Sequence, residues 1–437
     1  MNAAILHSRV SARAILILLA SLVLVSLLFT FIFHARIETG PFIRSHPVLF
    51  SRTFDLRLRY NEIQCLRSGI DPFTVWSGER SSQRYYRYDR PAPSPDAEPI
   101  HAYAPWVYTY LYPLATLPWP LAVSIFYMIE VLAALTLAAF AFRTGWGIAH
   151  RTGDAILCMA APFLVGFPYE VCLYFGNFGI IVTALILLMV FFLNRGREVA
   201  AGICWALIMS KPQLGLLLSI PLLIQRKYLT ILTAVLICVA ASLWPAWLCR
   251  SSPLSLILCL GEAGKPYVWT TLLIPGPLFT LLSRWIGTGL TALASAVAGI
   301  SLCTLLAWRT RHAGRWEWLM MPALLFATAW SYGHCHDRCV WGLIELFWVV
   351  MLIRTEGWRR RLPLVLLILL FAHESLMVIQ PAFPFTWFQE VTAVTAAGGF
   401  HLLLSGLFFL LPGLSVLAGA AWCWLNAGVG TERGQAG

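Results

Sequence analysis

The sequence predicts an all-α polytopic membrane protein: a bundle of about 12 (roughly 10–13) transmembrane helices with one large loop after the first. Hydrophobic residues make up 59% of the 437 residues, charged residues only 12%, and the mean hydropathy is +0.74. A soluble domain carries about 25% charged residues. Apolar runs of nearly membrane-spanning length also recur, since a span needs about 20 apolar residues. Together these observations exclude a soluble protein.

The first predicted transmembrane helix covers residues 14–34. Its centre, Ile15 to Phe33, contains no charged residue, and Arg9 and Arg13 precede it. A signal peptide has a shorter apolar core and a cleavage site of small residues. The sequence FHARIETG that follows is a poor cleavage site, so we expect this helix to be retained.

The loop predicted next, residues 35–104, is a large polar segment that we place on the extracytoplasmic side. Lys and Arg concentrate in the short loops on the opposite side, a bias that marks cytoplasmic loops. We therefore expect both termini in the cytoplasm and a multi-pass chain in the cell membrane, with residues 1–437 forming a single integral membrane domain. The net charge of +11 follows from this topology, so it does not predict a nucleic-acid partner.

The transmembrane bundle is expected over residues 105–425, followed by a cytoplasmic tail at 426–437. After the first helix, the predicted spans lie near 121–142, 154–168, 178–194, 198–210, 213–225, 229–248, 288–308, 316–331, 339–354, 362–381 and 398–425. Two of them are short and are separated by Lys211-Pro212. Such interrupted segments are tolerated at membrane depth only where they line a cavity or pack within protein, which predicts a broken helical hairpin.

Asp55 is the first candidate for chemistry, because it follows the first predicted helix closely and opens the polar run FDLRLRYNEIQCLR. A carboxylate flanked by Arg57 and Arg59 can accept a hydroxyl proton as a general base. The alternative is structural, since Asp is a good N-cap for an amphipathic helix that starts here. Asp71 precedes a proline in a sequence typical of a turn, which favours a structural role.

Lys211 and Asn177 are candidates within the predicted bundle. An ionisable residue inside a hydrophobic run is a functional hypothesis by default, and Lys211 could pair with an anionic phosphate. The alternative is that its long side chain reaches the nearer membrane interface. Asn177 follows a glycine at the start of a predicted span, where the two residues cap the helix and allow close approach.

The densest polar run outside the long loop is SYGHCHDRC, from Ser331 to Cys339. Its His and Cys spacings do not match the usual zinc patterns, so no metal is expected. Recognition of a phosphate or hydroxyl by His334, His336 and Arg338 is a better hypothesis, because Arg binds phosphate in a bidentate manner. A plain polar loop between helices remains the alternative.

Two further observations concern cofactors and buried acids. The chain has no phosphate-binding loop sequence, no Asp-x-Asp and no Rossmann glycine run, so we expect no nucleotide cofactor. Glu130, Glu345 and Glu374 fall inside predicted spans, where acids are buried, paired or pore-lining.

Taken in order, these features resemble glycosyltransferase family 87, a family of GT-C-type integral membrane enzymes that includes polyprenyl-phosphate-mannose-dependent mannosyltransferases. The residues that carry the resemblance are Asp55, Tyr60, Leu66, Gly69-x-Asp71-Pro72-Phe73, Tyr103-x-Pro105, Gly176-Asn177, Arg195-Gly196-Arg197, Ala201-Gly202 and Lys211. The likeness extends over about Phe54 to Tyr228, with the remainder similar in topology alone.

The resemblance implies a GT-C-like helical bundle in which Asp55 is the catalytic base of an inverting hexosyl transfer. The donor would be a polyprenyl-phosphate-linked sugar and the acceptor a hydroxyl of a lipid or glycan, at the extracytoplasmic face. Carried onto this chain, Lys211 contacts the phosphate, and His334 or His336 joins the site. Substrate contacts are further expected from Arg57, Asp71, Tyr103, Asn177 and Arg338.

Two other classes of function remain open from the residues alone. A transporter or flippase for a lipid or small solute predicts internal repeats and acids near mid-span; the three intramembrane glutamates fit it, although the sequence shows no repeat. A scaffold protein predicts that no single polar residue is essential.

Overall fold

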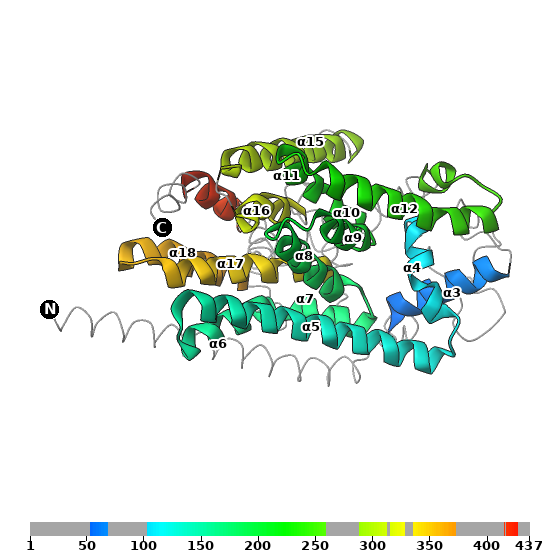
Figure 1. The fold of residues 1–437 in the computed structure, drawn as a ribbon, viewed down its shortest axis with the longest axis horizontal. Helices are drawn as coiled ribbons and strands as arrows, with labels where there is room; N and C mark the ends of the chain where they lie inside the picture. The colour runs from blue at the N-terminus through cyan, green and yellow to red at the C-terminus, as the bar shows by residue number, and fades with distance from the viewer. Residues whose placement is uncertain are drawn as a thin grey trace, which may run out of the picture.

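The computed structural model describes residues 53–68, 103–258, 288–312, 315–327, 335–372, 415 and 417–426. Within these ranges the chain forms α-helices and short 3-10 helices and contains no strand (Figure 1). The all-helical fold class is therefore confirmed. The predicted first transmembrane helix, most of the long loop, and three predicted residues (Asp71, His334 and Glu374) lie outside the described residues.

The described helices follow the predicted spans closely. In chain order they are α3 (Phe54–Arg67), α4 (Pro105–Ala115), α5 (Trp119–Ala149), α6 (Thr152–Ala160), η2 (Ala161–Phe163), α7 (Phe167–Phe175), α8 (Gly179–Leu193), α9 (Glu198–Ile208), α10 (Pro212–Gly215), η3 (Leu216–Leu218), α11 (Ser219–Ile224), α12 (Tyr228–Leu248), α15 (Thr288–Thr310), α16 (Trp316–Ala327), η4 (Cys335–Val340), α17 (Trp341–Arg354) and α18 (Trp358–Ala372). Proline stands in the first turn of α4, α5, α7 and α10, where its fixed φ favours a helix start.

Two of these helices, α5 and α12, are long and apolar enough to cross a membrane. The 31 residues of α5 extend over about 46 Å at 1.5 Å per residue, more than a bilayer core of about 30 Å. Their outer faces carry large exposed apolar side chains, with Met128 65% and Leu132 64% exposed on α5. Such continuous apolar surface is stable against lipid rather than water, so the chain is a membrane protein.

The number of spans stays a prediction. The bent pair of segments Thr152–Phe163 and Pro168–Phe175 adds one further membrane-spanning unit by length and composition. Other apolar helices of the described residues, such as α8, α9 and α16, have 10–17 residues. Several of the predicted spans fall partly outside the described residues.

The predicted break at Lys211-Pro212 is present. Helix α9 ends at Ile208 and α10 begins at Pro212. Lys211 has φ −120° and ψ 83°, because a residue before proline is disfavoured in the helical region. The sequence therefore sets Lys211 in a short non-helical turn inside an otherwise helical bundle.

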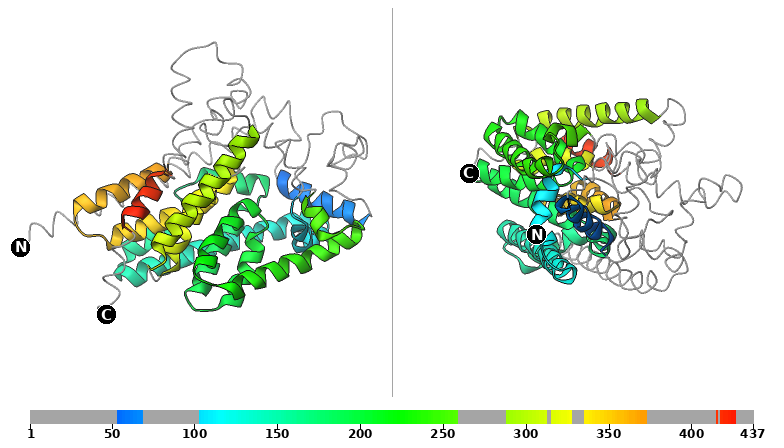
Figure 2. Two further views of the ribbon diagram at one scale, coloured as in Figure 1. Left: turned by 90° about the horizontal axis from the view of Figure 1, so that it is seen from above. Right: turned by 90° about the vertical axis from the view of Figure 1, so that its right-hand side faces the viewer.

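Helix α3 packs onto one end of the bundle beside α4, α7 and the C-terminal half of α12 (Figures 1 and 2). Its buried face follows helical spacing through Leu56, Arg59, Ile63 and Leu66, as expected of an amphipathic helix. An arginine thus occupies a position that the spacing assigns to the core, so α3 buries charge as well as apolar surface.

A glycine at the end of α7 allows the first turn of α3 to approach. Gly176 has φ +67°, and a Cβ added to it would lie 2.9 Å from the Cβ of Leu56. On the same side, the backbone N–H of Thr53 donates to the carbonyl of Tyr174 at 2.8 Å. Glycine is required here both for its backbone conformation and for the close contact.

We predict that Gly176→Ala detaches α3 locally, whereas Gly196→Ala does not. Gly196 has nearly the same φ, +68°, but no atom lies within 4 Å of its added Cβ, so both variants share a backbone cost of about 1 kcal/mol. Only Gly176→Ala adds a clash with α3. Maleimide labelling of the buried Cys65 in α3, followed by mass spectrometry, should accelerate in Gly176→Ala alone; equal rates in both variants would contradict this.

Candidate active site

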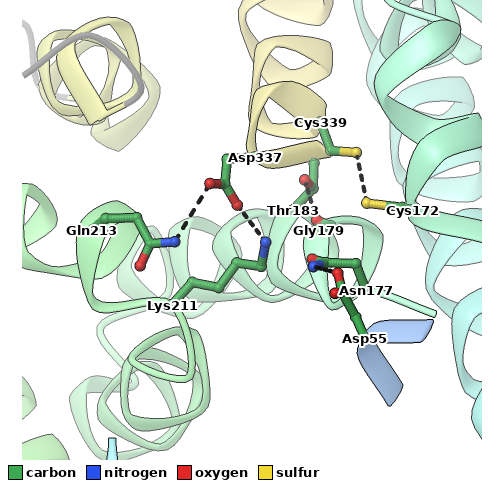
Figure 3. A network of polar contacts seen from close by, with 9 residues as sticks. All are labelled: Asp55, Cys172, Asn177, Gly179, Thr183, Lys211, Gln213, Asp337 and Cys339. Carbon is green, nitrogen blue, oxygen red and sulfur yellow. Dashed lines mark hydrogen bonds and ion pairs between the residues drawn. The ribbon is translucent and has the colours of Figure 1, made fainter. Parts of the chain in front are cut away.

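Asp55 lies in the first turn of α3 and is held by the turn that joins α7 to α8. The Nδ2 of Asn177 donates a hydrogen bond of 2.6 Å to its Oδ2 (Figure 3). Asp55 is half-buried, and its other oxygen, Oδ1, has no hydrogen bond within the described residues. The carboxylate is thus fixed at one oxygen and open at the other.

These contacts settle two structural alternatives. The N-cap of α3 is Thr53, so Asp55 does not cap its helix. The N-cap of α8 is Phe178 and makes no side-chain capping bond, so the expectation that Asn177 caps that helix is wrong. Its side chain turns to Asp55 instead, because the turn after Gly176 directs it toward α3.

Lys211 forms a buried ion pair with Asp337 in η4 (Figure 3). Both side chains are at most 1% exposed. Gln213 Nε2 donates to the second Asp337 oxygen at 3.4 Å. A fully enclosed charge pair therefore joins the turn between α9 and α10 to η4, a segment more than 100 residues later in the chain. Lys211 does not extend to a membrane interface.

Tyr103 interacts electrostatically with both of these pairs. Its electrostatic surroundings include Lys211, Asp55, Arg59 and Asp337. The guanidinium of Arg59 lies 4.4 Å from the centre of the Tyr103 ring, a cation–π arrangement. Tyr103 therefore interacts with charges of α3, of the turn before α10 and of η4.

Arg59 is compensated inside α3 by an acid one turn later. Its Nη2 lies 3.1 Å from Glu62 Oε1, and both side chains are almost fully buried. Burial raises the pKa of the Glu62 carboxyl to about 7, an effect that the charge of Arg59 opposes. Burial likewise raises the pKa of Tyr103 to about 12, with Lys211 opposing, so Tyr103 is a neutral hydroxyl at neutral pH.

The remaining predicted residues are placed differently. The guanidinium of Arg57 lies 4.7 Å from the ring centre of Trp119 on α5. Arg338 is half-buried, 5.5 Å from the Trp341 ring centre and next in sequence to Asp337. His336 belongs to η4.

Three residues of the cluster were not predicted as site residues: Arg59, Glu62 and Asp337. Helical spacing from Leu56 places Arg59 on the buried face of α3, which was the available signal. Asp337 was visible in the polar run of residues 331–339, and a lysine inside an apolar run requires a carboxylate partner. The sequence did not indicate which carboxylate it is.

The arrangement of possible metal ligands can be compared with the expectation that no metal takes part. Among the described residues no group of three His, Cys, Asp or Glu side chains is arranged to hold a metal ion. The expectation that no metal or nucleotide cofactor takes part remains a prediction.

The fold and site define a helical membrane protein with a partly open carboxylate beside a buried, charge-balanced cluster. Residues 101–331, more than half of the chain, match the sequence model of glycosyltransferase family 87, and the chain belongs to this family. The predicted resemblance is thereby confirmed, and the family indicates a glycosyltransferase. Searches of curated proteins and of solved structures gave no significant match. The matched range includes Tyr103, Asn177 and Lys211, whereas Asp55 and Asp337 lie outside it.

We predict that the Lys211–Asp337 pair matters far more for stability than a partly exposed pair in the same bundle. Lys211→Met leaves a buried carboxylate uncompensated and should lower the free energy of unfolding by about 3–5 kcal/mol. Lys227 pairs with Glu198 at 2.8 Å with 27% and 24% of the side chains exposed, so Lys227→Met should cost about 1 kcal/mol or less.

The double variant Lys211→Met/Asp337→Leu should regain most of the lost stability, since no unpaired charge remains. Denaturant titration of the purified protein in detergent measures all three variants. Equal losses for Lys211→Met and Lys227→Met would contradict the special role of the buried pair.

Proposed function

We propose that the protein transfers a hexose, by the family resemblance mannose, from a polyprenyl-phosphate-linked donor to a hydroxyl of a lipid or glycan acceptor. The reaction would take place at the extracytoplasmic face of the cell membrane and invert the anomeric configuration, with Asp55 as base. The proposal places both termini of a multi-pass chain in the cytoplasm.

The observation that carries the proposal is the state of Asp55. Asn177 holds Oδ2 at 2.6 Å, while Oδ1 has no partner within the described residues. A general base needs one oxygen within hydrogen-bond reach of the proton that it removes. The contact from Asn177 restrains the carboxylate without occupying both oxygens.

In the proposed reaction, Asp55 is the base. Oδ1 of Asp55 removes the proton of the acceptor hydroxyl, whose oxygen attacks the anomeric carbon from the side opposite the phosphate. The bond between that carbon and the phosphate oxygen breaks, and the lipid phosphate leaves with the bonding electrons. The product is a glycoside of inverted configuration, and the base carries one proton to be released to water.

Negative charge develops on the leaving phosphate in the transition state. Stabilising such charge is usually the largest single contribution to catalysis. Lys211 is a buried cation that interacts electrostatically with Tyr103, but it already neutralises Asp337. A phosphate at Lys211 would therefore share this lysine with the carboxylate. Arg338 is half-buried beside the pair, and its fork of donors suits a phosphate.

A membrane-embedded donor agrees with the surface of the bundle. The exposed apolar faces of α5 and α12 allow a polyprenyl tail to remain in lipid while its phosphate reaches the end of the bundle where α3 lies (Figure 1). A soluble nucleotide donor would need a phosphate-binding segment that the sequence lacks.

We predict that Asp55→Asn lowers the initial rate of sugar transfer by about 10²–10⁴-fold, the usual contribution of a general base. Asp154→Asn is the matched control, because Asp154 also lies in the first turn of a helix, α6, away from the cluster. Membranes with equal amounts of each variant receive a radiolabelled polyprenyl-phosphate hexose.

Transfer that survives in Asp154→Asn and fails in Asp55→Asn supports Asp55 as the base. Undiminished transfer by Asp55→Asn would support the assignment as a transferase but show that Asp55 is not its base. Absence of transfer with the unaltered chain, across mannosyl and glucosyl donors, would count against the proposed donor class.

The second candidate function, a transporter or flippase for a lipid or small solute, has one observation in its favour. Glu130 on α5 and Glu345 on α17 are fully buried, and neither carboxyl oxygen of either residue has a hydrogen-bond partner within the described residues. Acids of this kind in membrane helices commonly belong to proton or ion pathways.

The transferase proposal predicts that Glu130→Gln and Glu345→Gln retain sugar transfer within about a factor of three. Neither residue contacts the Asp55 cluster, and such uncharged, near-isosteric replacements disturb packing little. Transport predicts the reverse pattern. The assay follows a fluorescent polyprenyl-phosphate hexose as it crosses the bilayer of proteoliposomes. If this movement is lost in both glutamine variants and kept in Asp55→Asn, the result favours the flippase.

A further inference from the structure

Two cysteines from distant parts of the chain meet directly behind the candidate site. Cys172 on α7 and Cys339 in η4 are 167 residues apart, yet their Sγ atoms are 3.4 Å apart (Figure 3). Both are thiols, and both side chains are fully buried. Among the cysteines of the described residues, this is the pair whose sulfur atoms are in contact.

Each cysteine is attached to one half of the charged cluster. The carbonyl of Cys172 accepts a hydrogen bond of 3.0 Å from the backbone N–H of Asn177, the residue that holds Asp55. Cys339 follows Asp337, the partner of Lys211, by two residues within the same 3-10 helix. The two sulfur atoms therefore lie where the segment that positions Asn177 touches the segment that positions Asp337.

A second contact keeps the two segments in register. The hydroxyl of Tyr169, one turn before Cys172 on α7, donates to the carbonyl of Cys339 at 3.2 Å. The backbone positions of both cysteines are thus fixed by contacts that do not involve sulfur. A disulfide has an S–S length of about 2.05 Å, so closing the bond requires the sulfur atoms to approach by little more than 1 Å, within reach of small side-chain rotations.

We propose that Cys172 and Cys339 form a disulfide that connects α7 to η4 behind the site. In this reaction each thiol loses a proton, the two sulfurs together give up two electrons, and one S–S bond forms. The acceptor is the disulfide of a thiol–disulfide oxidant, which takes up the two electrons and two protons and becomes a pair of thiols.

The redox setting is the one element of this inference that depends on the proposed function. If this end of the bundle faces the extracytoplasmic side, it matures in an oxidising compartment, where disulfides form and persist. Because both sulfurs are buried after folding, the bond would form as α7 and η4 come together and would then be shielded from reductants. Its consequence is mechanical: Asn177 and Asp337 are kept at a fixed separation.

The thiol state of the full chain tests the inference without any activity assay. Membranes are dissolved in dodecyl sulfate with N-ethylmaleimide, so that buried free thiols are also blocked, and the purified protein is digested without reductant for mass spectrometry. We expect the Cys172 and Cys339 peptides to be joined, and to separate after treatment with a phosphine reductant. Recovery of both residues as maleimide adducts would overturn the proposal and identify the pair as buried thiols.

Variants make the assignment specific. Cys303→Ser removes another fully buried cysteine, on α15, and should leave the joined peptides intact. Cys172→Ser should abolish them and leave Cys339 as a thiol. Protein produced under reducing conditions, so that the bond never forms, should melt on the order of 5 °C below oxidised protein for the unaltered chain and for Cys303→Ser, and at the same temperature for Cys172→Ser.

These readouts separate the inference from the proposed transfer reaction. Joined peptides in a protein without sugar transfer would support the disulfide and count against the transferase. Transfer with both cysteines free would support the transferase and overturn the disulfide.

Discussion

The buried ion pair of Lys211 and Asp337 is the constraint on which the site depends. A lone charge in an apolar bundle costs several kcal/mol, so neither residue is tolerated without the other. Proline after Lys211 forces the lysine into a turn between α9 and α10, and the pair then joins that turn to η4. The bundle therefore acquires a fixed polar centre where helical periodicity alone would place apolar side chains.

The second half of the site is assembled onto this centre by α3. The helix docks against the turn after α7, where only glycine at position 176 allows Leu56 to approach. That contact brings Asp55 to Asn177 and carries Arg59 onto the ring of Tyr103. The Asp55 carboxylate, hydrogen-bonded at one oxygen, thus lies beside a cluster whose other charges are buried in ion pairs. This difference in exposure supports the proposal that Asp55 is the base.

Much of the fold was predictable because local chemistry decides it. Apolar run length located the helices, and proline located the turn at Lys211. The candidates Asp55, Tyr103, Asn177 and Lys211 came from the sequence, but their partners did not. Asp55 and Asn177 are 122 residues apart and Lys211 and Asp337 are 126 apart. Such pairings depend on tertiary packing, which periodicity does not encode, so the pairing of Lys211 with Asp337 emerged only from the structure.

The most direct test of the assembled site is a double-mutant cycle between Asp55 and Asn177, measured as initial rates of sugar transfer from a polyprenyl-phosphate hexose. A hydrogen bond to a charged group contributes about 1.5–3 kcal/mol, or about 10–100-fold in rate. The account predicts that Asn177→Ala costs this much when Asp55 is present and almost nothing when Asp55→Asn is also present. Losses that simply multiply would show that the two residues act independently, and would contradict a site built on their contact.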